Sequence, residues 1–259
     1  MKIDIFQRIE NATKPDFGTI LSKSFELFQK LFKEAVMHGL VSLLVLIPFF
    51  IVVYVPILPM YIEMLQNAGD PYYTPSAFED YSVLFIICWV ILVLVLSFVL
   101  QVVSMSIAVH FYKVTKNKDM GTNDETGGYF DLLKNNFGKL LMLSLATFGI
   151  AILATLACYL PIFYVMVPLQ LIVPLLAFNE KLGVSDIIKA AFKLGNKYWL
   201  IAFGLIWLSS LIAQLGIILC GIGIIFTAYF VHIVVYYFYK DSVGFDDNSN
   251  EIMEGNQGF

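Results

Sequence analysis

The residues of this sequence best suited to chemistry are a few polar side chains set inside long apolar segments. Gln101, Gln170 and His232 lie in three different predicted membrane crossings, at depths that differ by no more than about two helical turns. Because burying such a side chain in lipid without a partner costs several kcal/mol, the three are predicted to face one another inside a helix bundle. There they would either line a polar path or form the hydrogen bonds that hold the bundle together, and the sequence leaves both roles open.

A second group of residues has the composition of a metal site. Glu34 and His38 are four residues apart on one predicted helix face, and His110 ends the same hairpin on the same side of the membrane. Carboxylate and imidazole ligands together suit a divalent metal. Histidines are also tolerated at a membrane interface without any ligand, and no second-shell carboxylate follows nearby, so the sequence predicts no metal ion and no cofactor.

Catalytic motifs are missing from the sequence. It contains no GxSxG or HExxH pattern, no phosphate-cradling glycine loop and no paired carboxylates on one helix face. No Asp, Glu, Lys or Arg falls inside any predicted crossing, although an ion-coupled transporter usually needs one. We therefore expect no enzymatic activity and no catalytic residue.

The segments that carry these residues are apolar enough to cross a membrane. Of the 259 residues, 59% are hydrophobic and 14% are charged, with a mean hydropathy of +0.80, whereas soluble domains are only about 45–50% apolar. A crossing takes about 20 apolar residues. Four runs without a charged residue reach that length: Ala35 to Ile62, Tyr81 to Tyr112, Leu140 to Asn179 and Tyr198 to Tyr239.

The last two runs are about twice the required length, so each is predicted to be a helical hairpin. Pro161 marks the reversal in the first of them, and Gly221 and Gly223 mark it in the second. Pro168 and Pro174 should kink the fourth crossing. The predicted fold is all-α: a polytopic membrane protein with six transmembrane helices in three hairpins and a single membrane domain at 1–240. The crossings are expected at about 36–60, 82–110, 140–160, 162–178, 198–219 and 222–239.

The charged connections predict the orientation. Fifteen of the sixteen Lys and Arg residues lie in the amino-terminal segment, the second-to-third connection and the fourth-to-fifth connection, and Lys240 follows the last crossing. By the positive-inside rule both termini are cytoplasmic. We expect a multi-pass protein of a bacterial inner membrane. A net charge of −4 without a basic patch indicates no nucleic-acid partner.

The cytoplasmic segments before the odd-numbered crossings are amphipathic. The first covers residues 16–34 and the clearest later one begins at Ser185. Such helices would lie in the headgroup layer and contact membrane lipids, or pack beneath the bundle as a cap. The candidate lipid-binding lysines are Lys23, Lys30, Lys33, Lys189, Lys193 and Lys197. The acidic tail at 241–259 is predicted to be disordered.

Three stretches carry a family resemblance: "DFGTILSKSFELFQKLFKE", "LPIFYVMVPLQLIVPLLAFNEKLGVSDIIKAAFKLGNKYWLIAFGL" and "CGIGIIFTAYFVHIVVYYFYK". Together they resemble flavobacterial six-helix integral membrane proteins of unknown function and, more distantly, the membrane domain of some glycerophosphodiester phosphodiesterases. Some of those flavobacterial proteins are named beta-carotene 15,15'-monooxygenases, enzymes that hold iron with four histidines on a propeller fold. This chain has three histidines and no strand-rich region, so the resemblance does not imply that activity here.

Two functions follow from these observations. The first is a non-enzymatic membrane scaffold or envelope-homeostasis factor that organises lipids through its amphipathic helices. The second is a conduit or transporter for lipid or a small neutral solute through the bundle. A scaffold requires a close-packed centre, whereas a conduit requires a centre that can open or hold water.

Overall fold

The computed structural model describes residues 4–70, 72, 81–157, 160–220 and 223–245, and the regular structure of that part of the chain is entirely helical. The fold class is therefore all-α, as predicted. The helices are α1 (Ile5–Glu10), α2 (Phe17–Lys30), α3 (Phe32–Tyr54), α4 (Leu58–Gln66), α5 (Val83–Met120), α6 (Asp131–Asn135), α7 (Phe137–Leu156), α8 (Leu160–Phe178), α9 (Val184–Lys197), α10 (Trp199–Cys220), α11 (Ile224–Thr227) and α12 (Phe230–Ser242).

Five of the described helices are long and apolar enough to cross a membrane: α3, α5, α7, α8 and α10. The polytopic architecture is thus confirmed, but the sixth predicted crossing at 222–239 is not one helix. It is divided into α11 and α12, and α12 continues past the predicted end to Ser242. Because α12 ends in "YYFYKDS", its last turns contain residues suited to an interface rather than to lipid.

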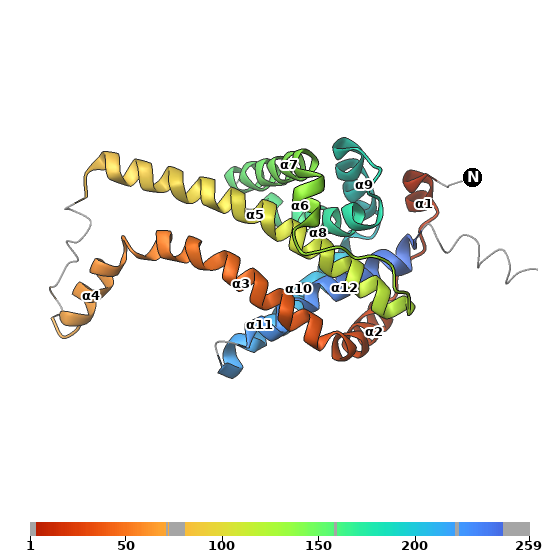
Figure 1. Ribbon diagram of the computed structural model, residues 1–259, viewed down its shortest axis with the longest axis horizontal. Helices are drawn as coiled ribbons and strands as arrows, with labels where there is room; N and C mark the ends of the chain where they lie inside the picture. The colour runs from red at the N-terminus through yellow and green to blue at the C-terminus, as the bar shows by residue number, and fades with distance from the viewer. Residues whose placement is uncertain (1–3, 71, 73–80, 158–159, 221–222, 246–259) are drawn as a thin grey trace, which may run out of the picture.

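The first hairpin extends well beyond the rest of the molecule. Helices α3 and α5 lie side by side, and their outer halves stand clear of the remaining helices (Figure 1). Two side chains of α5 and its approach segment bond to the end of α3: the Trp89 indole donates to the Val52 carbonyl at 2.9 Å, and the Tyr81 hydroxyl donates to the Pro56 carbonyl at 2.9 Å. Large apolar side chains cover the outside of this pair, including Leu44, Ile51, Leu84 and Ile91. Lipid is the solvent that suits such a surface.

At the opposite end, α5 is longer than predicted. The predicted crossing ends at residue 110, but the helix continues for ten more residues to Met120 and stops at Gly121, whose φ of 68° is left-handed. Phe111, Tyr112 and Thr115 in this extension are fully buried. This end of the molecule, which also contains α2, α9 and the end of α12, is called the lysine-rich end below.

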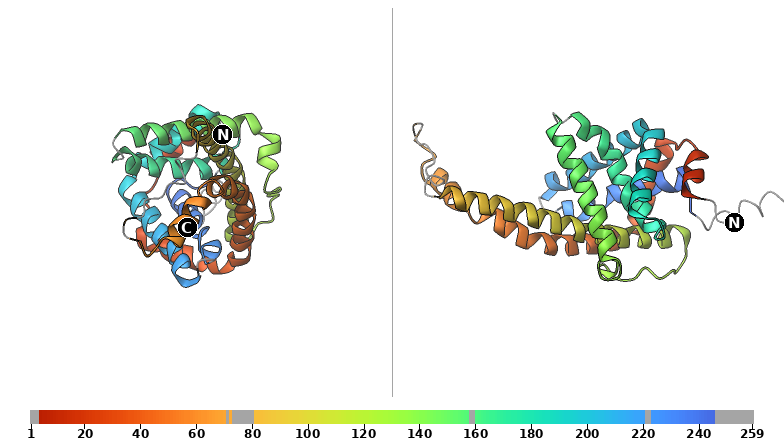
Figure 2. Two further views of the ribbon diagram at one scale, coloured as in Figure 1. Left: turned by 90° about the vertical axis from the view of Figure 1, so that its left-hand side faces the viewer. Right: turned by 90° about the horizontal axis from the view of Figure 1, so that it is seen from above.

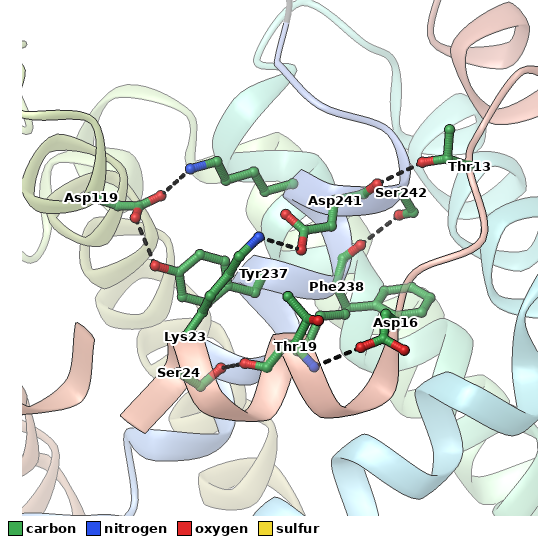
Figure 3. Close-up of polar contacts among 12 residues, drawn as sticks. Thr13, Asp16, Thr19, Lys23, Ser24, Asp119, Tyr237, Phe238, Asp241 and Ser242 are labelled. Carbon is green, nitrogen blue, oxygen red and sulfur yellow. Dashed lines mark hydrogen bonds and ion pairs between the residues drawn. The ribbon is translucent and has the colours of Figure 1, made fainter. Parts of the chain in front are cut away.

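A buried carboxylate joins α5 to α12 at the lysine-rich end. Asp119 accepts hydrogen bonds from the hydroxyls of Tyr236 and Tyr237, both at 2.7 Å, and from the Lys240 ammonium at 2.5 Å. Figure 3 shows Asp119 facing Tyr237 across the two helices. The Lys23 ammonium of α2 contacts the Asp241 carboxylate at 3.1 Å, so α2 is tied to the same part of α12.

The two main amphipathic helices pack against protein along their apolar faces. Helix α2 packs on α12 and buries Ile20 and Leu27, and helix α9 packs on α8 and buries Ile187 and Leu194. Of the two arrangements left open by the sequence, these contacts correspond to a cap at the end of the bundle. The amphipathic segment predicted before the third crossing forms only the short helix α6.

The prolines and glycines of the spans act chiefly through packing. Pro168 lies within α8 and fits against Gly195 of α9, where an added Cβ would meet the proline ring at 3.1 Å. Gly216 of α10 and Gly223 pass so closely that an added Cβ on Gly216 would lie 2.6 Å from the Gly223 carbonyl. Gly223 thus permits a close crossing, while Gly221 lies outside the described residues.

The two ends of the described chain are tied together. The backbone N–H of Thr13 donates to the Ser242 carbonyl at 3.2 Å, and the Thr13 hydroxyl donates to the Asp241 carbonyl at 2.8 Å. Phe245 is buried against the ring of Phe178. Residues 241–245 therefore belong to the folded domain, which corrects the predicted start of a disordered tail at 241, and 246–259 lie outside the described residues.

Candidate functional site

A cavity of about 730 Å³, broadly open to the surface of the membrane part, lies between α3, α5, α7, α8 and the start of α12. All three polar residues predicted to face the bundle centre line it: Gln101 from α5, Gln170 from α8 and His232 from α12. Helices α5, α7 and α8 pack against one another, and the right-hand view of Figure 2 shows α7, in green, crossing α5. The remaining polar lining residues are Ser42, Ser104, Thr147 and Tyr229.

The walls of this cavity are otherwise apolar. They include Met105, Phe163, Val165, Met166 and Leu169. No Asp, Glu, Lys or Arg is among the described residues that line it. A mostly apolar pocket of about 300–1,000 Å³ with a few placed polar groups has the usual form of a small-molecule site in a protein. Its lining suits an uncharged, largely apolar molecule.

The polar side chains of the cavity differ in how far they are already paired. The Gln101 amide donates to the Thr147 hydroxyl at 2.6 Å, and that hydroxyl donates onward to the Ser144 carbonyl at 3.0 Å. The Tyr229 and Ser42 hydroxyls are 2.7 Å apart. These contacts hold helices together and leave little capacity for a ligand.

Gln170 is different. Its side chain makes no hydrogen bond or other polar contact with any residue in the described part of the chain, although it lies on a helix with three prolines in the middle of the membrane domain. An amide in this position has two donor hydrogens and an acceptor oxygen available. His232, whose Nδ1 is 3.4 Å from the Tyr112 hydroxyl, makes only a long contact. Gln170 and the smaller hydroxyl of Ser104 are therefore the polar groups of the cavity that have no partner among the described residues, and the amide of Gln170 offers more hydrogen-bonding capacity.

The six candidate lipid-binding lysines fall into two sets. Lys23 pairs with Asp241, Lys193 pairs with Glu10 at 2.5 Å, and Lys197 donates to the carbonyls of residues 9, 10 and 12. The Lys193 ammonium holds the pKa of the Glu10 carboxyl below its ordinary value. The second set comprises Lys30, Lys33 and Lys189. Their ammonium groups make no hydrogen bond or ion pair with other described residues and remain available to lipid headgroups.

The residues considered for a metal site come together only in part. His38 Nε2 and His110 Nδ1 are 2.8 Å apart, but Glu34 contributes its backbone carbonyl to His38 rather than a carboxylate ligand. Within the described residues no group of three or more His, Cys, Asp or Glu side chains has the arrangement of a metal site.

Several residues of the cavity were not singled out from the sequence. Ser42, Thr147 and Tyr229 are polar residues within apolar segments. The criterion that identified Gln101 and Gln170, a polar side chain inside a predicted crossing, would also have identified them if it had been applied to hydroxyl groups. No protein-family model, curated protein or solved structure matches this chain.

Proposed function

We propose that this protein binds an uncharged, largely apolar molecule, such as a lipid with a small neutral polar group, in the cavity beside Gln170, and carries it within or across the membrane. The role is non-enzymatic. The observation that carries the proposal is an unpaired glutamine amide in a mostly apolar cavity of about 730 Å³. A hydroxyl, amide or carbonyl on the ligand would pair with this amide, while its apolar part would contact the walls supplied by α8.

The alternative of a purely structural scaffold is supported by one specific observation. Lys30 at the end of α2, Lys33 at the start of α3 and Lys189 on α9 remain available at one end of the molecule. The exposed aromatic side chains of Phe25 and Phe32 are close in sequence to the first two. Basic and aromatic residues in this combination attract anionic headgroups. The apolar faces of α2 and α9 are already packed against other helices, however, so a lipid-organising role would depend on these few side chains.

The same proposal places the protein in a bacterial inner membrane with both termini in the cytoplasm. The clustering of lysines at the end formed by α2, α9 and the connection after α5 supports this orientation. The resemblance to the membrane domain of glycerophosphodiester phosphodiesterases, a group of enzymes that act on lipid-derived substrates, is in keeping with a lipid ligand and remains a proposal as well.

Photo-crosslinking in native membranes tests the proposal. A photoreactive phenylalanine derivative would replace Met166, which lines the cavity, and in a separate variant Leu153, which is 69% exposed on the outside of α7. We expect ultraviolet light to attach one defined small molecule at position 166, identified by the added mass, and a mixture of bulk phospholipids at position 153. The same mixture at both positions would contradict a selective cavity.

The substitution Gln170→Leu completes the test. It removes the unpaired amide and keeps the apolar volume, so the protein should fold with an unchanged melting temperature while capture at position 166 falls by about tenfold or more, as expected for about 1.4 kcal/mol of lost pairing. Unchanged capture in this variant would show that the amide plays no part. Leu171, which is fully buried beside it, provides the matched position for a Leu171→Met control.

A further inference from the structure

Two histidines from different helices are joined at the lysine-rich end of the first hairpin. His38 of α3 is only 2% exposed, and its Nε2 lies 2.8 Å from Nδ1 of His110 on α5. The outer nitrogen of each ring meets a backbone carbonyl: His38 Nδ1 is 2.6 Å from the Glu34 oxygen, and His110 Nε2 is 3.1 Å from the Gly127 oxygen. Four ring nitrogens and two carbonyls thus form one continuous chain of contacts.

The number of hydrogens on the four ring nitrogens follows from the two backbone carbonyls at the ends of this series of contacts. A carbonyl oxygen only accepts hydrogen bonds, so both outer nitrogens must carry hydrogen. A neutral imidazole has one N–H, and two neutral rings with hydrogen on their outer nitrogens would face each other with two bare lone pairs. At 2.8 Å those lone pairs repel. One further proton between the two inner nitrogens turns this repulsion into a charge-assisted hydrogen bond, which is short and strong.

We infer that His38 and His110 form a proton-binding site that holds one shared proton between His38 Nε2 and His110 Nδ1. The pair then carries a single positive charge and contains three N–H hydrogens. As a result, the stability of the contact between α3, α5 and the connection that contains Gly127 depends on pH. This inference does not depend on the cavity or its ligand.

Burial of His38 disfavours a positive charge on its ring, and the groups that surround it there are aromatic. Three aromatic rings pack around it, with centroid distances of 5.0 Å to Phe111, 4.7 Å to Tyr129 and 5.5 Å to Tyr229. Aromatic rings within about 6 Å of a cation attract it and offset part of its loss of hydration. The nearest titratable ring beyond them is His232 on α12, 5.2 Å from Tyr229.

The other charged groups near the pair lie on the His110 side. Burial of His110 and the nearby Lys113 on α5 disfavour a positive charge on His110, whereas the Gly127 carbonyl and Asp131 at the start of α6 favour one. Both line a polar cavity of about 260 Å³ together with His110, Glu125 and Glu180. His38 does not line this cavity, so the shared proton exchanges with water through His110. On α3 itself, Glu34 is the nearest charged residue in the sequence.

A neutral arrangement of the same pair is the alternative to be tested. His38 would donate to Glu34, His110 Nδ1 would donate to His38, and His110 Nε2 would carry no hydrogen and face the Gly127 carbonyl across 3.1 Å. This arrangement has two N–H hydrogens rather than three. The difference of one proton is directly measurable.

Nitrogen NMR of the full chain labelled with ¹⁵N-histidine distinguishes the two arrangements. The chain contains three histidines, so a His232→Asn variant leaves only the signals of the pair. Near neutral pH we expect hydrogen on both outer nitrogens and a through-hydrogen-bond coupling between the two inner ones. A His110 Nε2 signal typical of a nitrogen without hydrogen, with both rings neutral, would overturn the inference.

The stability of the protein provides a second measurement. The folded pair holds one proton, whereas two unfolded histidines with pKa values of about 6.5 hold more than one below that pH and fewer than one above it. Stability conferred by the pair therefore rises with pH up to about 6.5 and falls above it, because stability increases with pH only where the unfolded state binds more protons.

The matched variant is His110→Asn, whose amide nitrogen can donate to His38 Nε2 without an extra proton. We expect the melting temperature of the wild-type protein in detergent to fall between about pH 6.5 and 8, and that of the variant to be level over this range. The same pH profile in both proteins would overturn the inference. If the variant does not fold, the NMR measurement on the His232→Asn protein decides alone.

Discussion

The Lys197 ammonium at the end of α9 lies 3.0 Å from the backbone carbonyl of Ile9. It also donates to the carbonyls of Glu10, at 2.6 Å, and Ala12, at 3.1 Å, so one lysine satisfies three oxygens where α1 ends. The Tyr198 hydroxyl adds a bond to Ala12 at 2.6 Å. Helix α1 has only six residues and would not be stable alone, so this contact fixes its position against α9.

Substituting Lys197 should release α1. In Lys197→Met the aliphatic stem is kept and the three donated hydrogen bonds are lost, each worth about 1.5–3 kcal/mol at most when the donor is charged. We expect proteases to cleave the segment around residues 4–15 several times faster in the variant, with the rest of the domain intact. Lys189→Met, on the same helix and without such contacts, should behave like the wild type, and equal cleavage of all three proteins would contradict this role.

The contact between α1 and α9 should weaken in acid. Lys193 holds the pKa of Glu10 below its ordinary value of 4.5, which means that the folded state favours the ionised carboxylate. The stabilisation is therefore present above about pH 4.5 and is lost as the pH falls through the lowered pKa. Protease cleavage of the amino-terminal segment should increase over this acidic range. The variant Glu10→Gln should already be cleaved at the faster rate and should lose this pH dependence; if it keeps the dependence, another group is responsible.

Asp119 should be the most sensitive carboxylate of the described chain. In Asp119→Asn the negative charge that balances Lys240 is lost. The amide nitrogen that replaces one carboxylate oxygen also cannot accept a hydrogen bond from a tyrosine hydroxyl. Removing one partner of a mostly buried charged group costs about 3 kcal/mol or more. We expect a clear fall in melting temperature in detergent. The exposed Asp124, changed to Asn, is the control, and an equal effect of the two substitutions would show that the Asp119 contacts contribute little.

A methyl group at Gly216 should prevent the close crossing of α10 and the following segment. The added Cβ would lie 2.6 Å from backbone atoms of Gly223, a distance that side-chain rotation cannot relieve. Gly216→Ala should therefore lower the melting temperature strongly. At Gly138 in α7 an added Cβ meets nothing within 4 Å, so Gly138→Ala should be neutral or stabilise the helix by about 0.5–1 kcal/mol. Equal stability of the two variants would show that the crossing tolerates separation.

The apolar runs were sufficient to predict the helical class and the position of most helices. Leu160–Phe178 and Trp199–Cys220 lie within a few residues of the predicted crossings, because length and the absence of charge determine such segments almost completely. The extension of α5 to Met120 was not predicted, since charges such as Lys113 end a lipid-facing segment without ending a helix. The division of α12 from α11 was also missed, because the composition of that run remains apolar throughout.

The polar residues of the candidate site could be predicted from the sequence, but the cavity that they line and their hydrogen-bond partners could not. Gln101, Gln170 and His232 were predicted to lie within about two helical turns of one depth, and all three line one cavity. Which of them has a partner depends on side chains of other helices: Thr147 pairs with Gln101, while nothing in the described residues pairs with Gln170. Contacts of this kind are set by tertiary packing, and periodicity in a single sequence carries no information about them. That Lys193 and Lys197 bind residues at the end of α1 could not be predicted for the same reason.

The length of α5 has a consequence for how the protein sits in its membrane. Its 38 residues extend about 57 Å at 1.5 Å per residue, whereas the hydrocarbon core of a bilayer is about 30 Å thick and the whole bilayer about 40–45 Å. Since the lysines after Tyr112 belong in water, the apolar remainder of the helix exceeds the core thickness and must incline within it. The thickness of the surrounding bilayer and the packing against neighbouring helices therefore determine the inclination of the first hairpin together, and a thinner membrane favours a larger tilt.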